Sequence, residues 1–215
     1  MQPIRVWDLP TRLFHWVLVV LIAAAWATNH YNKMEWHVWI GYSILTLLIF
    51  RIIWGLIGSD TARFTRFLRS PVAALRHLSH LTRREADTEV GHNAAGGWMV
   101  LLMLALIAVQ TGTGLFANDD ISIEGPLMHL VDKEQSDWLT RIHGWNFDLI
   151  QIVIVLHVIA VAAYMLLKRQ NLVRPMVTGV KQMPPGIIAP TLRSPLLAAA
   201  VLVVAAGIVA WVVRL

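Results

Sequence analysis

Two histidines, His143 and His157, lie fourteen residues apart in one long apolar segment of the chain. At 100° per residue an α-helix brings their imidazoles within about 40° of each other, and its rise separates them by about 21 Å along the axis. That distance is most of a bilayer's hydrocarbon thickness of about 30 Å. Ionisable residues in membrane helices are costly and are usually functional. We therefore interpret both histidines as metal or haem ligands, one near each membrane face, rather than as unrelated buried residues.

The composition indicates the class of protein. Of 215 residues, 57% are hydrophobic and only 14% are charged, against roughly 25% charged in soluble domains, which predicts an integral membrane protein. The absence of cysteine excludes disulfides, iron–sulfur clusters, thiolate-bound zinc and covalently attached c-type haem within this chain. The net charge of +5 is distributed as membrane topology requires, so we expect no nucleic acid partner.

Five apolar runs are each long enough to cross a bilayer as a helix. They cover about residues 13–29, 36–57, 90–117, 142–167 and 195–213. The proline-rich segment 178–195 is typical of a stiff linker. We therefore predict an all-α integral membrane protein, with a four-helix transmembrane bundle in residues 1–177, this linker, and an extra C-terminal transmembrane helix in residues 196–215.

The distribution of charge predicts the orientation in the membrane. Lys and Arg gather in the N-terminal tail and in the connections that follow the second and fourth runs. Six acidic residues and only two basic ones occupy the connection between the third and fourth runs, from Asp119 to Arg141. The N-terminus is therefore predicted to be cytoplasmic, and the acidic connection and the C-terminus periplasmic, in a bacterial inner membrane.

Further histidines match the first two in depth. His37 begins the second run and His143 begins the fourth run at the same predicted outer face, so the two could ligate one metal from opposite sides. His15 begins the first run at the inner face. It would meet His157 if the fourth helix continued a turn or two past the membrane. His92, at the inner start of the third run, is a rival inner ligand.

Two bis-histidine pairs at two depths of a four-helix bundle are typical of a two-haem membrane cytochrome. Haem b needs no cysteine and takes axial imidazoles from facing helices. A porphyrin needs small residues beside it, and Gly41 and Gly144 adjoin the outer pair, although close helix packing would also explain them. A zinc site is less plausible because each pair lacks a clustered third ligand. Three arginines could pair with haem propionates or simply extend to the interface: Arg12, Arg51 and Arg141.

Several segments resemble the bacterial cytochrome b561 family, which includes the cytochrome b subunit of nickel–iron hydrogenases and, more distantly, the membrane subunit of formate dehydrogenase. The resemblance covers about residues 4–180 and rests on the fourteen-residue histidine spacing together with four motifs. These are Trp7-Asp-Leu-Pro-Thr-Arg-Leu-Phe-His15-Trp16, His37-Val-Trp-Ile-Gly41, Phe50-Arg51-Ile-Ile-Trp54-Gly55 and Gly91-His92-Asn93.

This resemblance implies two haem b groups and their ligands. His15 would pair with His157 on the inner haem, and His37 with His143 on the outer haem, in agreement with their depths. It also implies a quinone site near the inner haem at the start of the third helix. The matching residues here are His92, Asn93 and Gly96. An imidazole and an amide that merely hydrate an interfacial helix start are an equally good explanation of the first two.

The sequence thus predicts electron transfer across the inner membrane between the quinone pool and a periplasmic redox partner, either a c-type cytochrome or a subunit of a redox enzyme. Membrane lipid surrounds the chain, which could also form a homo-oligomer. One alternative is a partner-independent oxidoreductase that passes electrons from quinol to superoxide or another small acceptor. Another is a non-redox protein that transports haem or protons, but the runs lack the paired acid–base chains and broken helices of transporters.

Overall fold

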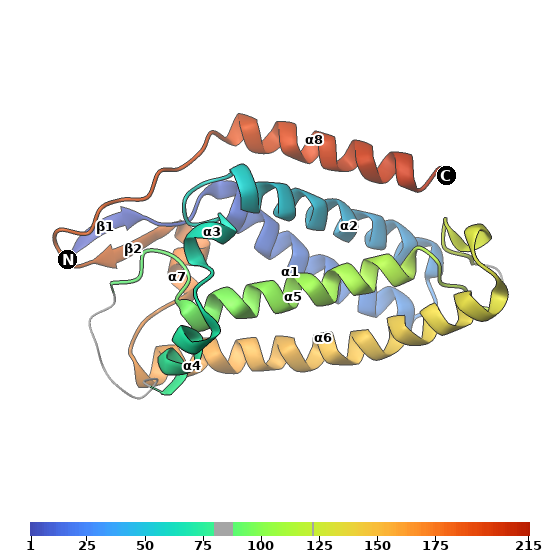
Figure 1. Ribbon diagram of the computed structural model, residues 1–215, viewed down its shortest axis with the longest axis horizontal. Coiled ribbons are helices and arrows are strands. Elements are labelled where there is room, and N and C mark those ends of the chain that lie inside the picture. Colours follow the sequence, from blue (N-terminus) through green and yellow to red (C-terminus); the bar gives the residue numbers. More distant parts are fainter. Residues whose placement is uncertain (80–87, 122) are drawn as a thin grey trace. The chain divides into compact units, whose positions relative to one another are not determined.

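A computed structural model describes residues 1–79, 88–121 and 123–215 of the chain. It contains five helices that are long and apolar enough to cross a membrane. They are labelled α1 (Leu9–His30), α2 (Met34–Ile57), α5 (Ala94–Gly114), α6 (Lys133–Leu167) and α8 (Pro195–Val212) in Figure 1. Helices suit these apolar runs because every backbone polar group is bonded within its own segment. They agree with the predicted all-α membrane protein, while its division into four helices plus one stays a prediction.

Helix α6 begins nine residues before the predicted fourth run. Hydropathy predicted a start near residue 142, whereas the helix begins at Lys133. The carboxylate of Asp132 accepts the Gln135 backbone N–H at 2.8 Å, and the Gln135 side chain accepts the Asp132 N–H at 3.3 Å. This reciprocal arrangement is a capping box, which fixes a helix start irrespective of hydropathy. The α6 helix is therefore about 52 Å long, well beyond the roughly 30 Å of a hydrocarbon core.

Short elements join the long helices. Strand β1 (Gln2–Arg5) pairs antiparallel with β2 (Val180–Met183), with Gln2 opposite Met183, and the two lie side by side near the N-terminus (Figure 1). Val6, Trp7 and Met183 are buried in a small apolar core around this pair. The remaining short elements are α3 (Phe64–Phe67), α4 (Pro71–Ser79), the 3-10 helix η1 (Met128–Leu130) and α7 (Val173–Thr178). The two strands were not predicted from the sequence.

The chain divides into two compact units, which we describe separately. Unit 1 comprises residues 1–13, 52–102 and 153–198, and unit 2 comprises residues 14–51, 103–152 and 199–215. Each of the five long helices contributes residues to both units. His37 and His143 both belong to unit 2, whereas His157 and His92 belong to unit 1.

In unit 1, Asp8 joins the start of α1 to the end of α2. Its side chain is buried, and one carboxylate oxygen accepts the Thr11 backbone N–H at 2.7 Å. The other oxygen accepts the indole N–H of Trp54 at 3.1 Å, and Trp54 is itself completely buried. Asp8 therefore both caps a helix and satisfies a buried donor on its neighbour.

We expect Asp8→Ala to destabilise the protein by about 2–4 kcal/mol, because it removes the helix cap and leaves a buried indole N–H without its acceptor. Thermal unfolding of the detergent-solubilised protein measures this. Asp132→Ala is the matched control, since it removes an exposed cap alone and should cost only about 0.5–2 kcal/mol. Equal losses in the two variants would contradict the role assigned to Trp54.

Backbone contacts hold the proline-rich segment against the loop that follows α2. The Asp60 N–H donates to the Thr191 carbonyl at 3.0 Å, and the Thr191 N–H donates to the Asp60 carboxylate at 2.9 Å. That hydrogen bond, together with the ion pair to Arg63, holds the pKa of Asp60 below its usual value. The Arg193 N–H donates to the Ser59 hydroxyl at 2.9 Å. The residues that lead into α8 are thus attached to unit 1.

Candidate cofactor site

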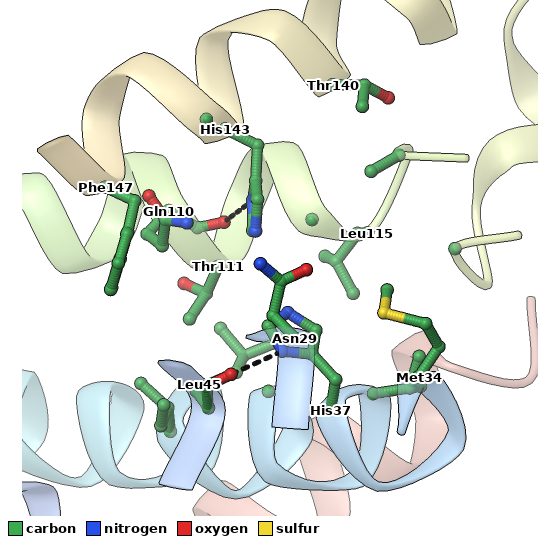
Figure 2. Close-up of a pocket in the computed structure, with 18 of the residues that line it drawn as sticks. Asn29, Met34, His37, Leu45, Gln110, Thr111, Leu115, Thr140, His143 and Phe147 are labelled. Carbon is green, nitrogen blue, oxygen red and sulfur yellow. Dashed lines mark hydrogen bonds between the residues drawn. The ribbon is translucent and has the colours of Figure 1, made fainter. Parts of the chain in front are cut away.

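Unit 2 contains a cavity of about 720 Å³. Its walls come from α1, α2, α5 and α6 and from the segment between α5 and α6. Figure 2 shows His37 of α2 and His143 of α6 extending into it from opposite sides. A largely apolar cavity of this size with a few convergent polar groups is typical of a cofactor site.

The two imidazoles are spaced as ligands of a single metal ion. Their ring centres are 6.2 Å apart and their planes are inclined at 73°. A metal–imidazole bond of about 2.0–2.1 Å, with the ring centre about 1.1 Å beyond the nitrogen, places two opposed rings about 6.2–6.4 Å apart. The observed separation agrees with that arrangement. The pairing of His37 with His143 stays a prediction, and the two rings lie in one unit at the separation that it requires.

Backbone carbonyls determine which ring nitrogen can bind a metal. Nδ1 of His37 lies 2.9 Å from the Ala25 carbonyl oxygen, and Nδ1 of His143 lies 2.9 Å from that of Gln110. A carbonyl oxygen only accepts, so each Nδ1 carries the hydrogen and each Nε2 keeps its lone pair. Histidines that ligate metals usually donate their other ring N–H in this way. Both residues thus offer Nε2 to the cavity.

Two glycines in the cavity wall leave room for a flat group. Gly41 lies one turn after His37, and Gly144 follows His143 directly. A Cβ built at either position meets no other atom within 4 Å. Close helix packing, the alternative explanation from the sequence, therefore does not account for these two residues. Gly114 differs, because a Cβ there would lie 3.0 Å from Cε1 of His143. Because Gly114 has no side chain, the His143 ring can lie against α5.

A buried amide contact fixes α6 against α5 beside His143. The Asn146 side chain is 5% exposed and donates to the Leu106 carbonyl at 2.9 Å and to the Gln110 side-chain oxygen at 2.7 Å. Gln110 thus contacts α6 twice, through its carbonyl to His143 and through its amide to Asn146. The sequence analysis missed both Asn146 and Gln110. The sequence offered one signal for Asn146, which is a polar amide in an apolar run one helical turn after His143.

The other two predicted haem ligands lie in different units. His15 belongs to unit 2 and His157 to unit 1, so their pairing stays a prediction. Of the three candidate propionate partners, Arg141 lines the cavity and Arg51 is buried at the end of the unit 2 part of α2. Arg12 belongs to unit 1 and donates to the Val177 carbonyl. All three propionate contacts stay predictions.

The predicted quinone residues lie at the start of α5. The Asn93 side-chain oxygen accepts the Gly96 N–H at 2.7 Å, and its amide nitrogen donates to the Tyr164 hydroxyl at 2.9 Å. The ring of His92 lies 4.7 Å from those of Trp7 and Phe67. Asn93 is therefore a helix cap that also contacts α6. The quinone role of these residues stays a prediction.

The number of metal-binding side chains that lie close together indicates which kind of metal group the site could hold. Within residues 1–79, 88–121 and 123–215, no three His, Cys, Asp or Glu side chains gather closely enough to hold a metal ion. A haem iron needs only two ligands from the protein, because the porphyrin nitrogens supply the other four. His37 and His143, whose Nε2 atoms keep their lone pairs, meet that requirement beside two open glycines.

Comparison with known families decides the identity. The sequence model of the prokaryotic cytochrome b561 family matches residues 6–179. The chain belongs to this family. It is therefore a membrane haem b electron-transfer protein. No curated protein and no solved structure matches the chain.

A haem b bound in unit 2 of this cytochrome would be held by His37 and His143 and flanked by Gly41 and Gly144. The haem supplies a one-electron iron couple. The protein's part is to present both Nε2 atoms, to hold the two imidazole N–H groups on carbonyls, and to surround the group with apolar side chains that keep water away.

We expect Gly114→Ala to weaken haem binding in this cytochrome by about 10–100-fold, the usual cost of disturbing a group that orients a metal ligand. The new Cβ would lie 3.0 Å from Cε1 and 3.3 Å from Nδ1 of His143, so the ring must shift, which disturbs its hydrogen bond to the Gln110 carbonyl. Haem dissociation and the low-spin absorption bands measure the effect. Gly112→Ala is the matched control on the same helix, since nothing lies within 4 Å of its Cβ. Equal haem affinities in the two variants would refute the role of Gly114 in packing against His143.

Proposed function

We propose that this cytochrome carries two haem b groups and transfers electrons across the inner membrane between the quinone pool and a periplasmic redox partner. The observation that carries the proposal is the opposed pair of His37 and His143 in the unit 2 cavity. Because both imidazole N–H groups are directed to carbonyls, this pair is suited to bind iron and unsuited to exchange protons. That distinction favours electron transfer over proton transport.

The second haem rests on the continuity of α6. This helix extends without a break from Lys133 to Leu167 and therefore carries both His143 and His157. At helical rise the two are about 21 Å apart, which suits one haem near each face of a bilayer. His15 on α1 is the proposed partner of His157. Family membership supports haem b, and this spacing supports a second copy.

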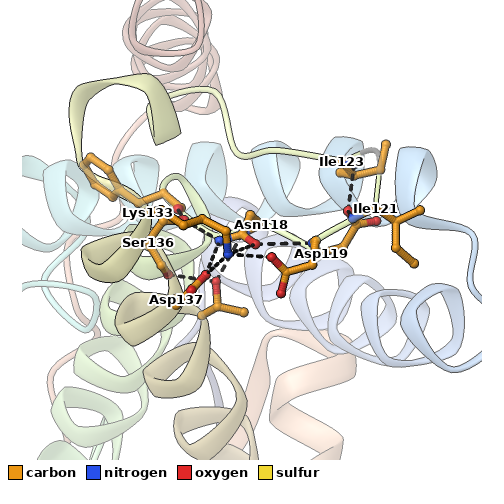
Figure 3. Close-up of polar contacts among 10 residues, drawn as sticks. Asn118, Asp119, Ile121, Ile123, Lys133, Ser136 and Asp137 are labelled. Carbon is orange, nitrogen blue, oxygen red and sulfur yellow. Dashed lines mark hydrogen bonds and ion pairs between the residues drawn. The ribbon is translucent and has the colours of Figure 1, made fainter.

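The proposed partner would dock on the acidic segment that borders the cavity. Asp119, which lines the cavity, accepts the backbone N–H groups of Ile121 and Ile123 with one carboxylate oxygen, at 3.0 and 2.8 Å. Lys133 bridges Asp120 and Asp137, and Asn118 donates to Asp137 at 3.0 Å (Figure 3). These contacts attach Asp119 and Asp120 to the neighbouring loop and to the start of α6.

Charge favours a basic partner on this side. Between residues 119 and 141 there are six acidic and two basic residues, a difference of four negative charges. Such a surface attracts a positively charged protein and speeds its association. A basic c-type cytochrome or a basic face of a redox-enzyme subunit fits this requirement.

The first experiment is a reduced-minus-oxidised optical spectrum with haem quantitation on the purified cytochrome, followed by addition of a short-chain ubiquinol. Two low-spin b haems per chain that ubiquinol reduces would support the proposal. One haem per chain would overturn the di-haem arrangement, and haems that ubiquinol leaves oxidised would overturn the quinone role. Rapid oxidation of the reduced protein by superoxide alone, without a protein acceptor, would show that no partner is required.

A further inference from the structure

Unit 1 contains a hydrogen-bonded pair of titratable side chains beside the predicted quinone residues. Tyr164, near the end of α6, is 7% exposed, and its hydroxyl oxygen lies 2.5 Å from Nε2 of His77 on α4. Asn93, at the start of α5, donates to the same hydroxyl. We propose that Tyr164 and His77 form a proton relay that serves the quinone reaction. This inference rests on the proposed quinone function.

The hydrogen bonds of Asn93 determine how the tyrosine proton is directed. Its side-chain oxygen accepts the Gly96 N–H at 2.7 Å, so its amide nitrogen is the atom that faces Tyr164, at 2.9 Å. This donation occupies one lone pair of the tyrosine oxygen. With a neutral imidazole, the tyrosine O–H donates to Nε2 of His77. With a protonated imidazole, Nε2–H donates to the second lone pair, and the tyrosine O–H then turns to another acceptor.

The pair also connects a buried position to a more exposed one. Tyr164 is buried, whereas His77 lies on the short surface helix α4 and is only partly buried. The rings are nearly parallel, inclined at 13°, with their centres 6.1 Å apart. To hold α4 in place, the contact would need only a hydrogen-bond donor and a hydrogen-bond acceptor. A histidine at this position also provides a group whose charge changes between about pH 5 and 8.

Among residues 1–79, 88–121 and 123–215, the charged groups on the elements around the pair are mostly basic. Arg76 precedes His77 on α4, and Lys168 lies just beyond α6 with its ammonium group 5.7 Å from the centre of the Tyr164 ring. His92 precedes α5, and the carboxylate of Glu89 is paired with Arg69 at 2.8 Å. Cations nearby disfavour a lasting positive charge on an imidazole. His77 should therefore pass on a proton that it receives.

The relay accounts for every proton of quinol oxidation. A quinol that becomes a quinone releases two electrons and two protons, and ferric haem takes the electrons one at a time. Each proton moves from a quinol hydroxyl to the Tyr164 oxygen as the tyrosine's own proton moves to Nε2 of His77. The imidazolium then loses its Nδ1 proton to water, and proton exchange with water returns the neutral ring from the Nε2–H to the Nδ1–H tautomer, so that Nε2 can accept again. Two such rounds complete one quinol, and quinone reduction uses the same groups in reverse.

The test compares Tyr164→Phe and His77→Gln with the wild type. His77→Gln is the informative variant, because glutamine can still hydrogen-bond to Tyr164 but cannot take up a proton. Stopped-flow reduction of the haem by short-chain ubiquinol should slow about tenfold or more in both variants, since general acid–base groups contribute at least that much. The wild-type rate should rise between about pH 5 and 8 as imidazole becomes neutral, and His77→Gln should lose that rise.

Dithionite reduction and haem content should stay unchanged in both variants, because neither requires the relay. Tyr31→Phe and His129→Gln are the matched controls, as both residues are exposed. If Tyr164→Phe loses haem, His77→Gln alone decides the outcome. Wild-type rates and pH profiles in His77→Gln would overturn the relay while leaving the quinone function intact. A wild type that ubiquinol cannot reduce would overturn the quinone function, and the relay with it.

Discussion

Replacing His143 with alanine should halve the haem content and stop electron delivery to an external acceptor. The substitution removes one of two axial ligands, and His37 alone cannot hold a low-spin haem. We expect one set of b-type bands to disappear from the reduced-minus-oxidised spectrum and the other set to remain. In vesicles with ubiquinol supplied, the remaining haem should become reduced, but reduction of added ferric cytochrome c should fall to the background rate.

Three further measurements make this prediction specific. His37→Ala should lose the same bands, because its ring centre lies 6.2 Å from that of His143 across the cavity. Added imidazole should restore part of the haem to His143→Ala, since it can occupy the space of the missing ring. His129→Ala is the control, as that residue is exposed on η1. Loss of both haems in His143→Ala with a folded protein would show that the two sites are not independent.

Replacing His157 with alanine should remove the other haem and abolish reduction by ubiquinol. The predicted inner haem depends on His157 and on His15, so His15→Ala should lose the same bands. Haem quantitation and ubiquinol-driven reduction of the variants measure both effects.

His92 provides the decisive comparison for this assignment. As a residue near quinone, it should tolerate alanine with both haems retained and only ubiquinol reduction impaired. If His92→Ala instead loses a haem that His15→Ala keeps, the rival ligand is correct, and His15 must be reassigned.

The sequence predicted the parts of the fold that long apolar runs encode. It missed the start of α6, because hydropathy ignores the polar turns that the Asp132–Gln135 capping box begins. It also missed β1 and β2. These are four residues each, and their pairing joins Gln2 to Met183, so no local pattern reveals the contact.

The same distinction holds at the candidate site. His37 and His143 were predicted as partners because depth in a membrane can be counted along the sequence. The carbonyls that orient them could not be predicted, since Ala25 and Gln110 contribute backbone atoms that every residue possesses. The contact of His77 with Tyr164 spans 87 residues and was likewise invisible. Such contacts depend on how helices pack, which a single sequence does not specify.

The two carbonyl contacts in the cavity have a consequence for how the cytochrome is assembled. Ala25 and Gln110 select one tautomer of each imidazole using protein atoms alone. A haem that binds here would therefore meet two rings whose tautomers are fixed by backbone carbonyls, which lowers the cost of ordering them. Haem insertion into unit 2 should then follow folding of the helices and require little rearrangement of them.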